Sequence, residues 1–196
     1  MKSMPHSSPP PLQPMLLTAL MAGLTAAMAL LRIPLPWTPV PVTGQTLAVI
    51  LAGALLGPRW GALSQAIYVA MGLAGLPVFA GGQAGLPAVL GPTGGYIWGF
   101  PAGAWVVGRL LPPRQAPGWA RAFLASLAGG VGVVYLLGVP WLALEAGLGL
   151  KQALIAGAVP FLPGDLLKCL AASAILPRLC RILHPFRSAG CTGEGG

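Results

Sequence analysis

The sequence predicts an all-α membrane protein with six transmembrane helices and both termini in the cytoplasm. Hydrophobic residues fill 56% of the 196 positions, and charged residues fill only 7%. Soluble domains carry about 25% charged residues, so a surface with so few charges must be covered mostly by lipid. The chain also contains apolar runs near the length of about 20 residues that a helix needs to cross a bilayer. The six runs span residues 15–33, 43–57, 60–77, 94–111, 119–140 and 161–183.

Proline and glycine residues separate these runs, as expected for residues that end helices. Gly57 and Pro58 divide the second run from the third, and Pro112 and Pro113 divide the fourth from the fifth. The first run is longer than the apolar region of a secretory signal, about 7–15 residues, so we predict a membrane helix there. The second run is short, and we expect its helix to be tilted or to be extended by the segment before it.

The distribution of basic residues predicts the orientation. If the N-terminus is cytoplasmic, eight basic residues lie on that side and only Arg32 and Lys151 lie outside, in agreement with the positive-inside rule. The eight are Lys2, Arg59, Arg109, Arg114, Arg121, Arg178, Arg181 and Arg187. Because they stand singly, the net charge of +8 indicates topology rather than nucleic-acid binding. We expect one transmembrane domain over 15–185, in a bacterial cytoplasmic membrane, between disordered tails at 1–14 and 186–196.

Three segments then face outward, at 32–43, 77–93 and 140–161. The second contains no charge and is rich in glycine and proline, which is unusual for a loop exposed to water. Irregular backbone at membrane depth must be covered by protein or must line a cavity. Two interpretations stay open: the segment folds back over the bundle as a lid, or it is a connector that packs on helix ends.

Asp165 and Lys168 are the first candidates for a binding site. Asp165 is the only acid within a predicted span, and charged residues in a span are costly and usually functional. Three-residue spacing places both on one helical face, near a helix start marked by Pro160 and Pro163. Such a pair offers an acceptor for N–H groups beside a cation for a carbonyl or carboxylate. The alternative is an internal ion pair that only makes both charges tolerable.

Other polar residues near the outer ends of the spans are further candidates. Thr43 and Gln45 begin the second span, where both can bind a ligand and Thr43 can instead cap the helix. Tyr68 in the third span would form an aromatic wall, and Gln65 on the same face would bind a ligand or a neighbouring helix. Tyr96 opens the fourth span, as a site residue or as part of an interfacial aromatic belt.

Ala19, Gly23 and Ala27 form a stripe of small residues along the first span, and such stripes let helices approach closely. The stripe packs either inside the bundle or against a partner protein, and the spacing does not decide between these. The sequence has no GxxxxGK(S/T), GxSxG or HExxH motif, and both histidines lie outside the predicted spans. We therefore expect no enzyme activity, metal site or cofactor, and active transport would draw its energy from another protein.

The chain resembles a known family in three stretches. These are PVPVTGQTLAVILAGALLG at 39–57, GLPVFAGGQAGLPAVLGPTGGYIWGFPAGAW at 75–105 and PFLPGDLLK at 160–168. They are similar to the BioY family, the biotin-binding S components of energy-coupling factor (ECF) transporters, and the likeness covers about residues 15–185. The resemblance implies a six-helix fold that holds biotin near the outer face. It also implies two kinds of partner, a transmembrane coupling protein and two cytoplasmic ATPases.

The resemblance assigns roles to individual residues. Its GD-x-x-K pattern carries the contacts with the ureido ring of biotin onto Asp165 and Lys168, and the loop 77–93 would close over the vitamin. This loop has no Arg or Lys, so the biotin carboxylate would meet Gln83 or backbone N–H groups, or would stay partly solvated. The residues expected around biotin are Thr43, Gln45, Tyr68, Gly81, Gly82, Gln83, Thr93, Tyr96, Asp165 and Lys168. The surface expected to meet the coupling protein is Ala19, Gly23 and Ala27.

Other functions stay open at this stage. An S component for a different vitamin, or a biotin transporter that works without an ATPase module, would keep the same fold. A membrane enzyme would have to use the Asp165–Lys168 pair, because the spans hold no other ionisable pair. A structural or assembly protein would bind no small molecule and would have no use for that pair.

Overall fold

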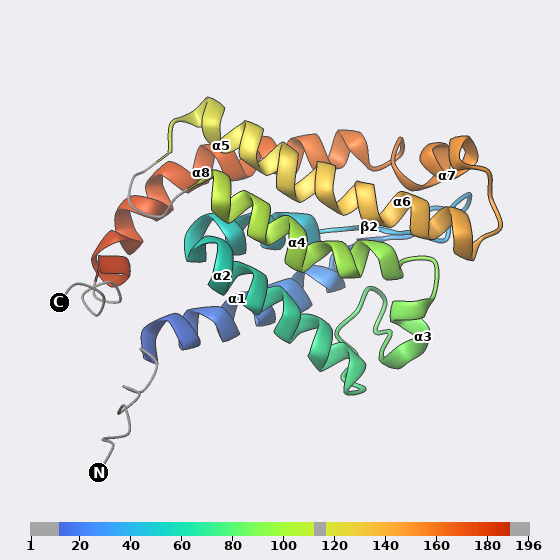
Figure 1. Cartoon of the computed structure of the whole chain (residues 1–196), viewed down its shortest axis with the longest axis horizontal. Coiled ribbons are helices and arrows are strands. Elements are labelled where there is room, and N and C mark those ends of the chain that lie inside the picture. Colours follow the sequence, from blue (N-terminus) through green and yellow to red (C-terminus); the bar gives the residue numbers. More distant parts are fainter. Residues whose placement is uncertain (1–11, 112–116, 189–196) are drawn as a thin grey trace, which may run out of the picture.

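The computed structural model describes residues 12–111 and 117–188, with side chains described as far as Cys180. The long helices pack side by side as an elongated bundle (Figure 1). The elements are α1 (Leu12–Leu30), β1 (Arg32–Ile33), β2 (Val42–Thr43), α2 (Gln45–Leu73), α3 (Gly85–Leu90), α4 (Gly94–Leu110), α5 (Trp119–Ala125), the π-helical η1 (Ser126–Val133), α6 (Val134–Glu145), α7 (Leu150–Gly157) and α8 (Leu162–Ser188).

The helix α2 folds back on itself and supplies two of the crossing segments. Gly57 has φ 80° and ψ −178°, which breaks the helix directly before Pro58. Eight residues of continuous helix would span about 12 Å. A Cβ on Gly61, however, would lie only 2.8 Å from the Cα of Gly53. The two arms are therefore antiparallel neighbours, and the division predicted at the Gly-Pro pair is confirmed (Figure 1).

The described chain crosses the bundle six times. Three of its helices are long and apolar enough to span a bilayer by themselves: α1, α2 and the segment Trp119–Glu145. A fourth candidate joins α7 to α8, which are bent by 53° at the break between them. The two arms of α2 count as separate segments, and α4, with 17 residues, is a further one. Together with α1, Trp119–Glu145 and the α7–α8 pair they make the six crossing segments that the sequence predicts.

Several predicted span boundaries near the outer end are wrong. The first helix covers Leu12–Leu30 rather than 15–33, and β1 follows it. The second span begins at Gln45 because Thr43 lies in β2, and the third ends at Leu73 rather than at 77. The cause of the first two differences is the proline-rich segment between α1 and α2, because residues before proline favour extended backbone. The segment forms a short antiparallel hairpin of β1 with β2.

The fifth and sixth spans are longer than predicted. Pro140 does not end its helix, which continues to Glu145, since packed membrane helices tolerate a missing backbone hydrogen bond. The last helix starts at Leu162 and reaches Ser188, beyond the predicted end at 183. Both predicted tails therefore lose residues to helices, and residues 1–11 and 189–196 lie outside the described part of the chain.

The two ends of the bundle differ in charge. The start of α1, the break in α2 and the end of α8 lie at one end, with Arg59 and Arg109 close to it (Figure 1). Arg121 also lies there and donates to the carbonyl oxygen of Leu110 at 3.1 Å. The hairpin, α3 and α7 lie at the other end. This arrangement agrees with cytoplasmic termini and makes the hairpin end the outer one.

Glycines allow the central helices to touch. Gly53 of α2 lies so close to α4 that a Cβ there would be 2.3 Å from the carbonyl oxygen of Ala104. On the other side of α4, a Cβ on Gly103 would be 2.6 Å from the carbonyl oxygen of Gly129 in η1. α4 is therefore clamped between α2 and the α5–η1–α6 segment. Large apolar side chains, many of them leucines, cover the outward faces and suit contact with lipid.

The variant Gly53→Ala should lower stability by about 1–3 kcal/mol, because its methyl group would overlap the Ala104 carbonyl oxygen. The midpoint of thermal unfolding in detergent measures this loss. Gly23→Ala is the matched control, since a Cβ at Gly23 would meet no atom within 4 Å. Equal midpoints for the two variants would contradict the close packing of α2 against α4.

Candidate ligand-binding site

A pocket lies toward the outer end of the bundle, between the β1–β2 hairpin, the loop 77–93 and helices α4, α6 and α8. The space between its walls is about 640 Å³ including the open mouth. Small-molecule sites usually measure about 300–1,000 Å³. Of the ten residues predicted around a ligand, seven line this pocket. They are Thr43, Gln45, Gln83, Thr93, Tyr96, Asp165 and Lys168.

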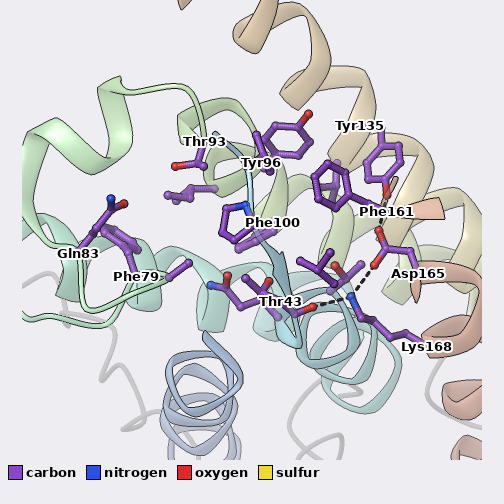
Figure 2. A pocket seen from close by; sticks show the side chains of 18 residues that line it. Thr43, Phe79, Gln83, Thr93, Tyr96, Phe100, Tyr135, Phe161, Asp165 and Lys168 are labelled. Atoms are coloured by element: carbon purple, nitrogen blue, oxygen red, sulfur yellow. Dashed lines mark hydrogen bonds and ion pairs between the residues drawn. The ribbon is translucent and has the colours of Figure 1, made fainter. Parts of the chain in front are cut away.

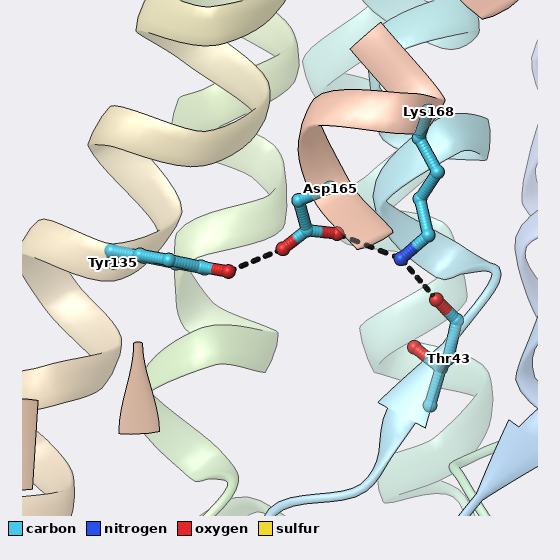
Figure 3. A network of polar contacts seen from close by, with 4 residues as sticks. All are labelled: Thr43, Tyr135, Asp165 and Lys168. Atoms are coloured by element: carbon cyan, nitrogen blue, oxygen red, sulfur yellow. Dashed lines mark hydrogen bonds and ion pairs between the residues drawn. The ribbon is translucent and has the colours of Figure 1, made fainter. Parts of the chain in front are cut away.

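Asp165 and Lys168 lie at one side of the pocket (Figure 2), near the start of α8 (Figure 3). Lys168 Nζ donates to Asp165 Oδ1 at 2.7 Å and to the carbonyl oxygen of Thr43 at 2.5 Å. Tyr135 of α6 donates its hydroxyl to the other carboxylate oxygen. Asp165 is only 4% exposed, so these partners take the place of water around its charge. Its place in the first turn of α8 adds a favourable interaction with the helix dipole.

This network leaves bonding positions unused on two residues that line the pocket. An ionised carboxylate has about four lone-pair sites, and the described partners of Asp165 use one on each oxygen. An ammonium group has three N–H donors, and Lys168 uses two of them. The pair can therefore accept two hydrogen bonds and donate one to a ligand. A ligand that carries an N–H group next to a carbonyl would match one acceptor and the remaining donor of the pair.

Gln45 connects the pocket to the loop above it. Its Nε2 donates to the Tyr68 hydroxyl at 2.5 Å, and that hydroxyl donates to the carbonyl oxygen of Val78 at 3.2 Å. Gln45 lines the pocket, and its Oε1 accepts no bond from another described residue. Tyr68 does not form the predicted aromatic wall, because its ring is fully buried behind Gln45 and Phe79. Tyr68 supports the wall from behind.

The loop 77–93 covers part of the pocket, which favours the lid interpretation. Phe79 is 1% exposed, lies edge-on to Tyr68 with 5.5 Å between ring centroids, and fills the notch at Gly72. Gly81 and Gly82 have positive φ angles of 77° and 73° and form the turn that follows. Neither lines the pocket, and the N–H of Gly82 already donates to the Phe79 carbonyl oxygen. Their predicted contact with a ligand is therefore not supported.

Tyr96 belongs to the pocket wall rather than to an exposed aromatic belt. It is 8% exposed, and its hydroxyl donates to the carbonyl oxygen of Gly157 at 2.7 Å. Its ring lies edge-on to Tyr135 at 6.2 Å. Gln65, the other polar candidate in the third span, bonds Thr25 of α1 and so joins two helices.

Sequence reasoning missed several residues of the pocket wall. Phe79, Phe100 and Phe161 supply apolar surface between the polar ends of the pocket (Figure 2). Tyr135 was missed because it stands in the apolar run 127–140. It is the one side chain in that run with a hydrogen-bonding group, and a buried hydroxyl needs a partner, so this signal was present. Its placement follows the π-helical η1, and such irregular turns are frequent at functional sites.

A comparison with protein families bears on this geometry. The family model described as "BioY family" matches residues 2–185. The chain belongs to the BioY family. The resemblance found in the three stretches of sequence is therefore confirmed. Membership makes this BioY-family chain a membrane transport component.

Individual relatives agree with this assignment. The biotin transporter BioY of Rhizobium etli is 39% identical over 182 residues, which cover 89% of this chain and 96% of the relative. The biotin transporter BioY of Thermotoga maritima is 39% identical over 163 residues, 82% of this chain and 94% of the relative. A solved structure, the S-component for biotin from an ECF-type ABC transporter, matches with a TM-score of 0.80 at 30% identity. That match covers 87% of this chain and 92% of the other.

The variant Lys168→Met should destabilise this BioY-family chain by about 3–5 kcal/mol, because it leaves the Asp165 carboxylate buried without a cation. The double variant Asp165→Asn with Lys168→Met removes both charges and should recover much of the loss. Thermal unfolding in detergent at neutral pH compares the three proteins. A single variant as stable as the wild type would mean that the pair contributes nothing to folding.

Proposed function

We propose that this chain captures biotin at the outer face of the membrane and delivers it for import into the cell. The observation that carries the proposal is the set of bonding positions left open by Asp165 and Lys168. The ureido ring of biotin has two N–H donors and one carbonyl acceptor. One N–H group suits a free lone pair of Asp165, and the carbonyl next to it suits the third donor of Lys168.

The remainder of the pocket supports the same ligand. Phe79, Phe100 and Phe161 offer apolar surface to the thiolane ring and to the methylene chain of biotin. The Oε1 of Gln45, a residue that lines the pocket, offers a further acceptor beside them. The relatives quoted above are named as biotin transporters, and the solved structure is that of an S-component for biotin. These names favour biotin over another vitamin, and membership of a transport family favours capture over catalysis.

The site also has a route for access and closure. The loop 77–93 supplies Phe79, Ala80, Gln83 and Thr93 to the pocket, so its displacement would open the pocket toward the outer end. The ligand then enters from outside and is covered when Phe79 returns to its notch at Gly72. Burial of the ring on closure contributes part of the free energy of occlusion.

We further propose that α1 meets an ECF coupling protein, which works with two cytoplasmic ATPases. Ala19, Gly23 and Ala27 all lie on the exposed side of α1. Thr18, Met21, Ala22, Thr25 and Ala29 form its buried side. The stripe of small residues is therefore available to a partner rather than used inside the bundle. ATP hydrolysis in the partner would reorient the chain, in a bacterial cytoplasmic membrane, and would release biotin inside.

Asp165→Asn should weaken biotin binding by about 10- to 150-fold, because it replaces a charged acceptor by a neutral amide. Equilibrium binding of biotin to the detergent-purified protein measures this change. Glu145→Gln is the matched control, because Glu145 is the other described acid and is exposed at the end of α6. Unchanged affinity in Asp165→Asn would refute the proposed site. A wild type that prefers another vitamin in competition would refute the ligand.

Gly23→Leu should leave biotin binding unchanged and abolish ATP-linked uptake, because the side chain would fill the exposed stripe on α1. Uptake of labelled biotin by cells that contain the ECF module measures the second effect. Ala128→Leu enlarges an exposed small residue on η1 and is the matched control. Normal uptake in Gly23→Leu would show that the partner binds elsewhere.

A further inference from the structure

A second cavity adjoins the ligand pocket on the side of the loop 77–93. Its walls enclose about 540 Å³ including open solvent, and it shares Pro41, Ala80, Gln83 and Thr93 with the first pocket. Arg32 is the one charged residue among those described around it. A ligand that extends past Gln83 and Thr93 would therefore leave the main pocket close to the guanidinium of Arg32.

The hairpin and the loop hold Arg32 in this place. Arg32 pairs with Thr43 across β1 and β2, and directly opposed residues of an antiparallel pair share one face. Its Nη1 lies only 1.9 Å from the position that a Cβ would take on Gly81. The guanidinium thus contacts the backbone of the loop 77–93 at Gly81. This residue has a φ of +77° and no side chain that would occupy the same space.

Arg32 has no side-chain partner among the side chains described at 12–111 and 117–180. It forms no ion pair there, since the only one described joins Lys168 to Asp165, and it makes no side-chain hydrogen bond. A solvated arginine is ordinary at a protein surface, so exposure alone carries no meaning. What sets this residue apart is its place on a cavity that continues the ligand pocket.

The two ends of the combined cavity differ in charge. Figure 2 shows Gln83 on the opposite side of the pocket from Asp165 and Lys168, with aromatic side chains between them. Asp165 and Lys168 form a pair with no net charge and with positions for an uncharged polar head group. Arg32 and Gln83 together present a cation and an amide, which suit a carboxylate.

We propose that Arg32 binds the carboxylate at the end of the ligand's aliphatic tail, with Gln83 beside it. This inference rests on the proposed function and adds to it a residue that selects acids over neutral derivatives. The loop 77–93 was expected to lack a cation for this role. The structure supplies one from β1 instead, placed against the loop. A bound carboxylate would then connect the hairpin to the loop, and the positive charge would also attract an anionic ligand from outside.

The test uses two ligands, biotin and biotinamide, in which a neutral carboxamide replaces the carboxylate. In detergent, the wild type should bind biotin more tightly than biotinamide. Arg32→Gln should weaken biotin binding about tenfold and leave biotinamide binding unchanged, so the preference for the acid disappears. Arg32→Lys should lose only part of the preference, because it keeps the charge and loses the bidentate geometry. Lys151→Gln, at the other outer cation, should change neither affinity.

Four results would overturn the proposal. Equal losses for both ligands in Arg32→Gln would assign Arg32 to the stability of the hairpin. No loss for either ligand in detergent, with a loss that arises only in bilayers of anionic lipid, would assign it to lipid phosphate. A wild type that binds neither ligand would overturn the proposed function together with this inference, whereas binding of both without preference would overturn this inference alone.

Discussion

The ion pair of Asp165 with Lys168 is the constraint around which the outer half of the bundle is organised. An isolated charge in an apolar interior costs several kcal/mol, so each charge here needs partners that water would otherwise provide. The partners come from three separate elements, namely Tyr135 on α6, the Thr43 carbonyl on β2, and α8 itself. The hairpin and two helices therefore converge on one point, and the pocket is the space that this convergence leaves open.

The helices meet so closely because glycine carries the contacts between them. In lipid, apolar side chains gain little by leaving one hydrocarbon surface for another, so close packing must hold the helices together. Gly53 and Gly103 place α4 within backbone contact of both neighbours. Substitutions there would be felt at the pocket, because α4 also carries Tyr96, Ile97 and Phe100 into its wall. Packing at the centre and ligand geometry at the outer end are therefore parts of one arrangement.

The sequence predicted those features that depend on local composition or spacing. Apolar length indicated the crossing segments, the Gly57-Pro58 pair marked the reversal in α2, and three-residue spacing placed Asp165 beside Lys168. Features that depend on distant contacts were beyond such reasoning. Nothing local indicates that two residues of β1 pair with two of β2. The burial of Tyr68 and the position of Arg32 against Gly81 likewise depend on contacts between residues far apart in the sequence.

Gln45 has one more consequence, because its amide belongs to the pocket and to the loop at the same time. One side of the amide faces the ligand space, and the other holds Tyr68, whose hydroxyl bonds the Val78 carbonyl at the base of the loop. A ligand that fixes the amide also fixes the donor that retains the loop. Occupancy and closure are then thermodynamically linked, and the coupling is reciprocal. A partner that binds the displaced loop must lower the affinity for the vitamin by some factor. Bound vitamin then lowers the affinity for that partner by the same factor.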